Sequence, residues 1–277
     1  MATCYRHPKV ETGVSCSNCG RPICTDCMTV TPVGMRCPEC ARQRTRVHTM
    51  RSLNSGDYVT RALIAINVLA FLASGSFTIS NGAGSAQIVN KGVLYGPSIE
   101  PGHEYWRLVT SGFLHANLLH IFFNMYLLFM LGQMLEPAIG RIRFGAIYFV
   151  ALLAGSLGAL IATPYSPTLG ASGAVFGLMG AAVVEMRSRG IDPMQSGIPM
   201  LIVLNLVISF TLPGISIGAH VGGLIGGSLA AAALNFADRR RSLALGLAAC
   251  VLLAAGAVGG SIAAARSAEV APMTSGP

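Results

Sequence analysis

Long apolar stretches without charged residues are the feature that most constrains this chain of 277 residues. A helix needs about 20 consecutive apolar residues to cross the hydrocarbon core, because it rises about 1.5 Å per residue. Only 11% of the residues are charged, and 52% are hydrophobic. We therefore expect an all-α polytopic membrane protein. The seven predicted spans lie near residues 58–78, 116–135, 143–164, 171–188, 197–212, 216–236 and 243–264.

The basic residues orient these predicted spans. Cytoplasmic loops carry an excess of Lys and Arg, and a cytoplasmic N-terminus puts nearly all arginines of the short loops on that side. Only Lys91, Arg107 and Arg266 then fall on the other side. We expect a cell-membrane protein with its N-terminus in the cytoplasm and its C-terminus outside. The net charge of +8 reflects this topology, and no nucleic-acid partner is expected.

The N-terminal region is rich in cysteine, with seven of the chain's eight cysteines between residues 4 and 40. The segments CYRH, CSNC, CTDC and CPEC each hold two metal-ligand residues separated by two others. Two such pairs complete a closed, tetrahedral structural site. We expect two structural zinc ions rather than disulfides, because the cytoplasm is reducing. The predicted ligands are Cys4, His7, Cys16, Cys19, Cys24, Cys27, Cys37 and Cys40.

The pairing of these ligands has two solutions. The short gap between the second and third pairs favours an interleaved arrangement, in which the first and third pairs hold one ion and the second and fourth hold the other. This arrangement resembles the B-box-type zinc finger, a family that cross-braces its ligands in this order. Pairs adjacent in sequence are the alternative. A domain this small needs the metal to fold, and its expected role is to bind a cytoplasmic protein partner.

Five polar residues lie within or beside the apolar stretches, where an unpaired polar group is costly and marks function. The second span begins with His115, His120 and Asn124. The fourth span begins with Ser172, and the sixth has His220 near its start. All three spans run from outside to inside if the N-terminus is cytoplasmic. We therefore expect the polar side chains at a similar, shallow depth below the outer surface.

Glycines follow the serine of the fourth span and the histidine of the sixth at helical spacing. Gly173 and Gly177 share one face of the fourth span, and Gly223 and Gly227 share one face of the sixth. Such spacing lets two backbones approach closely within a bilayer. We expect these spans to pack together and to bring the serine to the histidine. A neutral histidine within hydrogen-bond reach activates a serine hydroxyl, here without a carboxylate partner.

Several motifs resemble the rhomboid family of intramembrane serine proteases. They are HANLLHIFFN at 115–124, GASG at 170–173 and AHVGGLIGG at 219–227, with WR at 106–107 and GQMLE at 132–136. The resemblance covers about residues 58–236 and implies a six-helix bundle, followed here by one extra C-terminal span. It implies cleavage of transmembrane protein substrates near the outer membrane face. No cofactor is expected for catalysis.

The resemblance implies a role for each matching residue. Ser172 would be the nucleophile, and His220 the base and then the acid toward the leaving amine. His120, Asn124 and the Ser172 backbone amide would form the oxyanion hole. Phe176 matches an aromatic position that packs against the catalytic histidine.

The matches in the long loop between the first two spans imply supporting roles. His115 matches a histidine near the cavity. Ser111 stands where some members carry another histidine, so this sequence departs from the pattern there. Trp106 and Arg107 match residues that anchor the loop at the membrane interface.

Two other functions fit parts of the sequence. A transporter or channel would need polar groups through the full depth, yet the inner halves of these spans have few. A catalytically inactive rhomboid-like adaptor would bind client helices, but we expect such relatives to lose the serine or the histidine. The expected domains are a zinc-binding domain at 1–45, a linker at 46–57, a protease core at 58–240, a seventh span at 241–264 and a disordered tail at 265–277.

Overall fold

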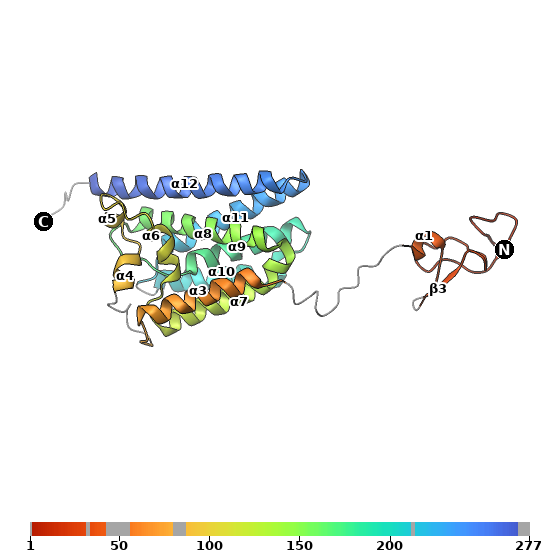
Figure 1. Ribbon diagram of the computed structural model, residues 1–277, viewed down its shortest axis with the longest axis horizontal. Helices are drawn as coiled ribbons and strands as arrows, with labels where there is room; N and C mark the ends of the chain where they lie inside the picture. Colours follow the sequence, from red (N-terminus) through yellow and green to blue (C-terminus); the bar gives the residue numbers. More distant parts are fainter. Residues whose placement is uncertain (1, 32–33, 43–55, 80–86, 212–213, 271–277) are drawn as a thin grey trace. The chain divides into compact units, whose positions relative to one another are not determined.

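The computed structural model describes residues 2–31, 34–42, 56–79, 87–211 and 214–270. The chain divides into two compact units, Met1–Leu53 and Asn54–Pro277. The predicted linker at 46–57 lies almost entirely outside the described residues. The second unit is a bundle of helices, as the apolar stretches predict (Figure 1).

In its described residues, the first unit contains two antiparallel strand pairs and one short helix. Its elements are β1 (Ala2–Thr3) paired with β2 (Glu11–Thr12), β3 (Thr29–Thr31) paired with β4 (Gly34–Arg36), and α1 (Pro38–Ala41). Apart from Ile23, the hydrophobic residues of its buried cluster are all cysteines. So small an apolar core does not by itself offset the entropy lost on folding, and a unit of this size depends on metal ions or disulfides.

The described residues of the second unit form seven longer helices and several short ones. The long helices are α3 (Tyr58–Ser74), α7 (Leu118–Ile139), α8 (Arg141–Ala162), α9 (Ser172–Ser188), α10 (Ile198–Thr211), α11 (Ile217–Arg239) and α12 (Leu243–Val270). The short ones are α4 (Gln87–Gly92), α5 (Gly96–Ile99), α6 (Arg107–Thr110), η1 (Ser111–Phe113) and η2 (Pro193–Ser196). Each of the seven predicted spans therefore corresponds to a helix.

Four described helices, α7, α8, α11 and α12, are long and apolar enough to cross a membrane. The helices α3 and α10 are apolar but shorter. In α9 every residue from Gly173 to Ala182 is buried. Because other helices surround α9, small residues suit it better than the large apolar residues that face lipid.

The ends of two helices differ from the sequence prediction. Helix α3 ends at Ser74 rather than near 78, because Gly75 adopts a left-handed backbone conformation with φ of 65°. Helix α12 continues to Val270, whereas we expected a disordered tail from 265. The expected disorder of residues 265–270 is wrong, because Ala and Arg are good helix formers and Ala265 is buried. Residues 271–277 lie outside the described part.

The centre of the bundle depends on a glycine seam between α9 and α11. A Cβ added at Gly223 would lie 2.0 Å from the carbonyl oxygen of Gly173, and one at Gly227 would lie 2.3 Å from that of Gly177. The predicted packing of the fourth span against the sixth is therefore confirmed. The neighbouring face of α11 meets α8 just as closely, since a Cβ at Gly222 would lie 2.4 Å from the carbonyl oxygen of Ala154.

A buried carboxylate ties α7 to the start of α3. Glu136 on α7 is 1% exposed. It accepts hydrogen bonds from the backbone N–H of Val59 (2.9 Å) and from both the N–H (2.8 Å) and the hydroxyl (2.7 Å) of Thr60. The first N–H groups of a helix have no acceptor of their own, and the helix dipole favours an anion there. Glu136 therefore supplies from another helix the cap that α3 lacks.

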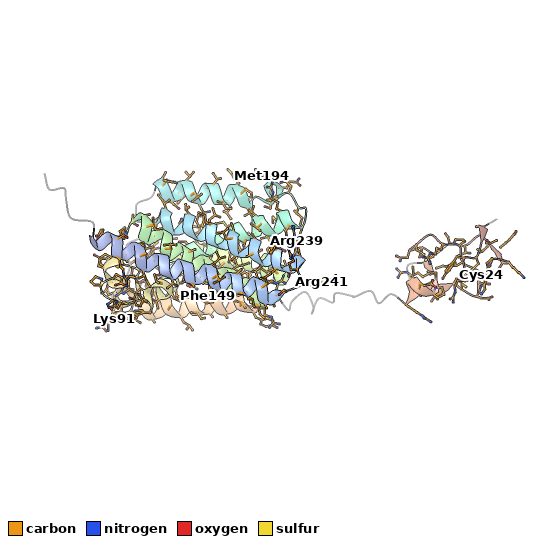
Figure 2. The ribbon with its side chains drawn as sticks, turned by 90° about the horizontal axis from the view of Figure 1, so that it is seen from above. Cys24, Lys91, Phe149, Met194, Arg239 and Arg241 are labelled. Atoms are coloured by element: carbon orange, nitrogen blue, oxygen red, sulfur yellow. The ribbon has the colours of Figure 1, made fainter. Side chains whose placement is uncertain are left out.

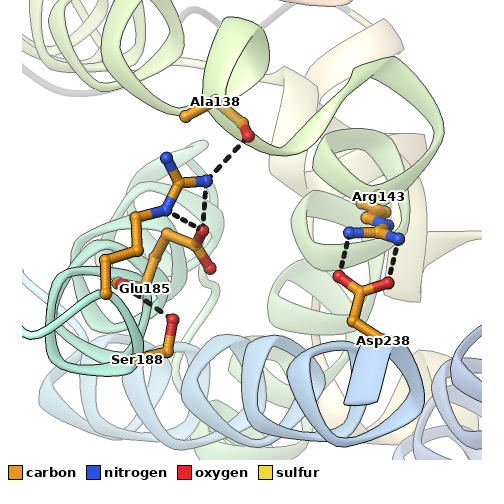
Figure 3. A network of polar contacts seen from close by, with 6 residues as sticks. Ala138, Arg143, Glu185, Ser188 and Asp238 are labelled. Carbon is orange, nitrogen blue, oxygen red and sulfur yellow. Dashed lines mark hydrogen bonds and ion pairs between the residues drawn. The ribbon is translucent and has the colours of Figure 1, made fainter. Parts of the chain in front are cut away.

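Polar contacts join the ends of four helices on the side opposite the long loop (Figure 3). Arg143 on α8 forms a bidentate ion pair with Asp238 on α11. Arg189, just after α9, bonds to the carboxylate of Glu185 (2.6 Å) and to the carbonyl oxygen of Ala138 on α7 (2.8 Å). Figure 2 shows Arg239 and Arg241 at this end and Lys91 at the other.

At the other end, the segment between α3 and α7 covers the loop that leads into α9. Leu94 and Thr168 exchange two backbone hydrogen bonds, each 2.9 Å long. The 5% exposed Arg107 holds the covering segment by donating to the carbonyl oxygens of Asn90 (2.8 Å) and Val93 (2.7 Å). Trp106 Nε1–H donates to the carbonyl oxygen of Lys91 at 3.1 Å. Trp106 and Arg107 thus anchor the loop through hydrogen bonds to its own carbonyl oxygens.

Replacing Glu136 by Gln should destabilise the bundle by about 2 kcal/mol. The amide offers one oxygen and turns an NH₂ group toward donors, so one buried donor loses its acceptor. Thermal unfolding of the detergent-solubilised protein measures the change. The control is Arg61→Gln, which removes an ion pair with Asp57 whose arginine side chain is 62% exposed, and it should cost under about 1 kcal/mol. Equal effects of the two variants would contradict the capping role of Glu136.

Candidate functional site

Ser172 and His220 meet at the ends of α9 and α11. The Oγ atom of Ser172 lies 2.7 Å from Nε2 of His220, which is 6% exposed. Both helices begin close to these residues, at Ser172 and Ile217, so the two polar groups sit where the glycine seam starts. The sequence prediction that these two side chains meet agrees with this geometry.

The imidazole ring of His220 is held on two further sides. The ring of Phe176, one turn after Ser172, stacks on it with centroids 4.2 Å apart and planes 16° apart. The Oγ atom of Ser209, on α10, lies 2.7 Å from Nδ1. The predicted aromatic packing is therefore present, while the contact of Ser209 was not anticipated. Ser209 lies near the end of the fifth predicted span, at the depth expected for the other polar groups, but depth alone does not say which way its side chain faces.

His120 faces the same site across Gly170. The backbone N–H of Ala116 donates to Nδ1 of His120 at 3.4 Å, so the neutral ring carries its proton on Nε2. A Cβ added at Gly170 would lie 2.7 Å from that Nε2 and 3.7 Å from Ser172 Oγ. Because residue 170 is glycine, no Cβ obstructs the gap between His120 Nε2 and Ser172 Oγ. Gly170 also has φ of 127°, a conformation that other residues rarely adopt.

The remaining predicted residues surround this opening. Asn124 lies one turn below His120, is 6% exposed, and donates one hydrogen to the carbonyl oxygen of His120 at 2.8 Å. Ser172 is the first residue of α9, where backbone N–H groups have no acceptor within the helix. His115 is fully buried, and its ring contacts that of His120 edge-on at 5.1 Å. His115 therefore supports His120 by packing.

The first unit brings the eight predicted metal ligands into two clusters. One contains Cys4, His7, Cys24 and Cys27, and in each cluster the four ligand atoms lie within 4.8 Å of one another. The second cluster contains Cys16, Cys19, Cys37 and Cys40. This grouping is the interleaved one, and pairs adjacent in sequence do not share a cluster. Each cluster is able to hold a metal ion.

The distances within the clusters suit a small tetrahedral ion. Sulfur atoms bound to zinc at about 2.3 Å in a tetrahedron lie about 3.8 Å apart. The Sγ atoms of Cys19 and Cys37 are 3.8 Å apart, and His7 Nδ1 lies 3.3 Å from Cys24 Sγ. The backbone N–H of Cys37 donates to Cys16 Sγ at 3.3 Å, a bond that favours the thiolate form that metals bind.

The fold and the site together define a multi-pass helical membrane protein that holds a serine–histidine pair near one end of its helices. A family profile described as the Rhomboid domain matches residues 102–235, which include every residue of that site. The pair and its surroundings therefore lie within the segment that the family shares.

Several known proteins of this family are similar in sequence to this chain. The Rhomboid protease GluP of Bacillus subtilis is 35% identical over 210 residues, which cover 74% of this chain and 40% of the relative. Rhomboid-like protease 1 of Toxoplasma gondii is 37% identical over 150 residues, half of each chain. Inactive RHOMBOID-like protein 8 of Arabidopsis thaliana is 31% identical over 150 residues, 52% of this chain and 42% of the relative. The chain belongs to the rhomboid family. It spans half or less of the length of these relatives.

The metal clusters lead to a stoichiometric prediction. The purified full-length protein should contain about two zinc ions per chain, because two four-ligand clusters are present. Cys24→Ser should remove one ion, and Cys37→Ser should remove the other, since the two residues belong to different clusters. Cys250→Ser is the control, because Cys250 lies in α12 and should leave the zinc content unchanged. Elemental analysis of the detergent-solubilised protein gives the ratio, and a folded first unit without metal would contradict the prediction.

Proposed function

We propose that this protein is an intramembrane serine endopeptidase that cleaves transmembrane proteins near the outer face of the cell membrane. The observation that carries the proposal is the 2.7 Å contact of Ser172 Oγ with His220 Nε2, with His120 facing the pair across Gly170. A serine hydroxyl becomes a nucleophile when a neutral histidine at hydrogen-bond distance accepts its proton. The names of two similar proteins include the word protease, which agrees with this chemistry.

In this reaction His220 Nε2 both accepts and donates the proton. Ser172 Oγ attacks the scissile carbonyl carbon while its proton passes to His220 Nε2. The tetrahedral intermediate collapses as Nε2 gives that proton to the leaving amine, and an ester remains on Ser172. A water molecule then attacks the ester carbonyl as its proton passes to the same nitrogen, and Nε2 returns that proton to Ser172 Oγ as the acyl–oxygen bond breaks.

The developing oxyanion needs donors that are already in position. The Nε2–H of His120 and the backbone N–H of Ser172 supply them in this proposal, and Asn124 keeps one amide hydrogen free after its bond to the His120 carbonyl oxygen. The start of α9 adds the positive end of a helix dipole. Donors fixed before the reaction stabilise the transition state most in a site of low dielectric constant.

The charge distribution supports an orientation for this bundle. Arginines lie at the ends of α8, α9 and α11 away from the serine–histidine site, as Arg239 and Arg241 do in Figure 2. By the positive-inside rule that end faces the cytoplasm. The N-terminus is then cytoplasmic, the C-terminus is outside, and Ser172 lies close to the outer face.

The N-terminal unit is, in this proposal, a B-box-like zinc domain that binds a cytoplasmic protein. Its support is the interleaved clustering of the eight ligands and the distances that fit tetrahedral zinc. All four positions of each ion would be filled by protein, so the zinc is structural. The proposed domains keep the boundaries 1–45 for this unit, 58–240 for the protease core and 241–264 for the seventh span, which α12 exceeds.

An inactive, helix-binding role is the second candidate, because one similar protein is named inactive. The name does not say which feature that relative lacks. In this chain Ser172, His220 and the donors around them are all present and within reach of one another. Proteolysis is therefore the function that the site supports best.

Ser172→Ala and His220→Ala should each abolish cleavage of a reporter transmembrane substrate in proteoliposomes while leaving the bundle folded. A fluorophosphonate should label the wild-type protein and not Ser172→Ala, because the phosphonyl group attaches to the activated hydroxyl. Ser166→Ala is the matched control, since Ser166 is an exposed serine in the loop before α9, and labelling should persist. Cleavage or labelling that survives in Ser172→Ala would sink the assignment.

Gly170→Ala should reduce kcat by on the order of 100-fold, because its methyl group would fill the space between His120 Nε2 and Ser172 Oγ. The matched control is Gly145→Ala on α8, where an added Cβ meets only Val59 at 3.9 Å. Initial rates on the same reporter, compared at equal amounts of folded protein, test the prediction. Wild-type turnover in Gly170→Ala would show that this space does not receive the oxyanion.

A further inference from the structure

Ser209 is an unusual residue for its position. Helix α10 is apolar, and Ile198 and Ser209 are its buried residues. Ser209 is 3% exposed, and its hydroxyl lies 2.7 Å from Nδ1 of His220. The Ser209 hydroxyl already has another hydrogen bond, to the carbonyl oxygen of Asn205 one turn earlier, at 2.7 Å. The contact therefore matters for the histidine.

The single proton of the Ser209 hydroxyl determines the direction of both bonds. The carbonyl oxygen of Asn205 only accepts, so the hydroxyl must donate to it. The hydroxyl oxygen then accepts the hydrogen bond from His220, which requires the proton of the neutral ring on Nδ1. With that proton on Nδ1, Nε2 has a free lone pair facing the hydroxyl of Ser172 at 2.7 Å.

We propose that Ser209 is a positioning residue that holds His220 in the tautomer able to act as a base, through a hydrogen-bonded chain from the Asn205 carbonyl oxygen to Ser172. This inference rests on the proposed endopeptidase function. It replaces the expected two-residue system with a serine–histidine–serine arrangement in which the second serine lies on α10. Ser209 acts through His220 and does not contact the substrate.

The same bond strengthens as the reaction proceeds. When Nε2 takes the proton of Ser172, the ring becomes a cation and Nδ1–H becomes a charge-assisted donor to Ser209 Oγ. Phe176 has a different role. Its ring fixes the plane of the imidazole by stacking at 4.2 Å but offers no acceptor for Nδ1–H. An interaction that is stronger in the transition state than in the ground state raises kcat rather than lowering KM.

The test compares three variants for cleavage of a reporter substrate in proteoliposomes. Ser209→Ala should lower kcat by about 10- to 100-fold with KM nearly unchanged, because a buried donor loses its acceptor. Ser209→Thr keeps the hydroxyl and should recover activity to within about threefold of the wild type. Thr211→Ala is the control on the same helix, since the Thr211 hydroxyl bonds only to carbonyl oxygens of α10, and it should leave kcat unchanged.

A second measurement does not depend on activity. The imidazole ¹⁵N signals of His220, identified by their loss in His220→Gln, report which ring nitrogen carries the proton. The wild type should show the Nδ1–H form, and Ser209→Ala should show a mixture of tautomers or the Nε2–H form. Ser209→Thr should keep the Nδ1–H form, as the wild type does.

The two measurements separate the possible failures. Unchanged kcat and an unchanged tautomer in Ser209→Ala would overturn the role of Ser209. Equal losses in Ser209→Ala and Ser209→Thr, with the Nδ1–H form kept in both, would also overturn it and would indicate a packing role. If the wild-type protein neither cleaves nor reacts with a fluorophosphonate, the endopeptidase proposal fails, while the ring tautomer still decides whether Ser209 orients His220.

Discussion

The close approach of α9 and α11 is the constraint on which the site depends. An added Cβ at Gly223 or Gly227 would overlap the carbonyl oxygens of α9, so the backbones themselves are in contact. Any side chain at these positions would push the helices apart by more than the slack in a 2.7 Å hydrogen bond. A helix pair that must keep Ser172 and His220 within that distance therefore requires glycine along the seam. The energy of this packing comes from dispersion and small-residue contact, because lipid supplies no hydrophobic drive between helices.

Several polar groups in the bundle are oriented by specific partners. Glu136 meets three donors at the start of α3, and Arg107 meets two carbonyl oxygens of the covering segment. The rings of His120 and His220 each have one nitrogen engaged by a neighbouring group, which leaves the other nitrogen directed at the site. Opposite tautomers result, with a donor at His120 Nε2 and an acceptor at His220 Nε2. One ring suits an oxyanion, and the other suits a hydroxyl proton.

Most of the site could be predicted from the sequence because its signals are local. The depth of Ser172 and His220 follows from their distance to the span ends, and the metal ligands follow from the two-residue spacing of their pairs. The contact of Ser209 could not be predicted in this way, because a serine in an apolar helix commonly bonds to its own backbone. Which face it turns toward His220 depends on the rotation of α10 against α9 and α11. The helical extent of α12 was also missed. Ala and Arg favour a helix there, but the bond of Arg266 to the buried Glu100, at 3.1 Å, joins it to a segment far away in the sequence.

The ion pair of Arg266 with Glu100 connects α12 to the loop beside the site. Glu100 belongs to the segment between α3 and α7, and a hydrogen bond from Tyr105 lowers the pKa of its carboxyl, which keeps it charged for Arg266. The same segment holds the loop before α9 through Leu94 and Thr168, and the carbonyl oxygen of Ser111 accepts from the N–H of Gly170 at 2.9 Å. Gly170 in turn borders the opening between His120 and Ser172. The C-terminal helix thus stabilises, through two loops, the backbone turn that leads into Ser172.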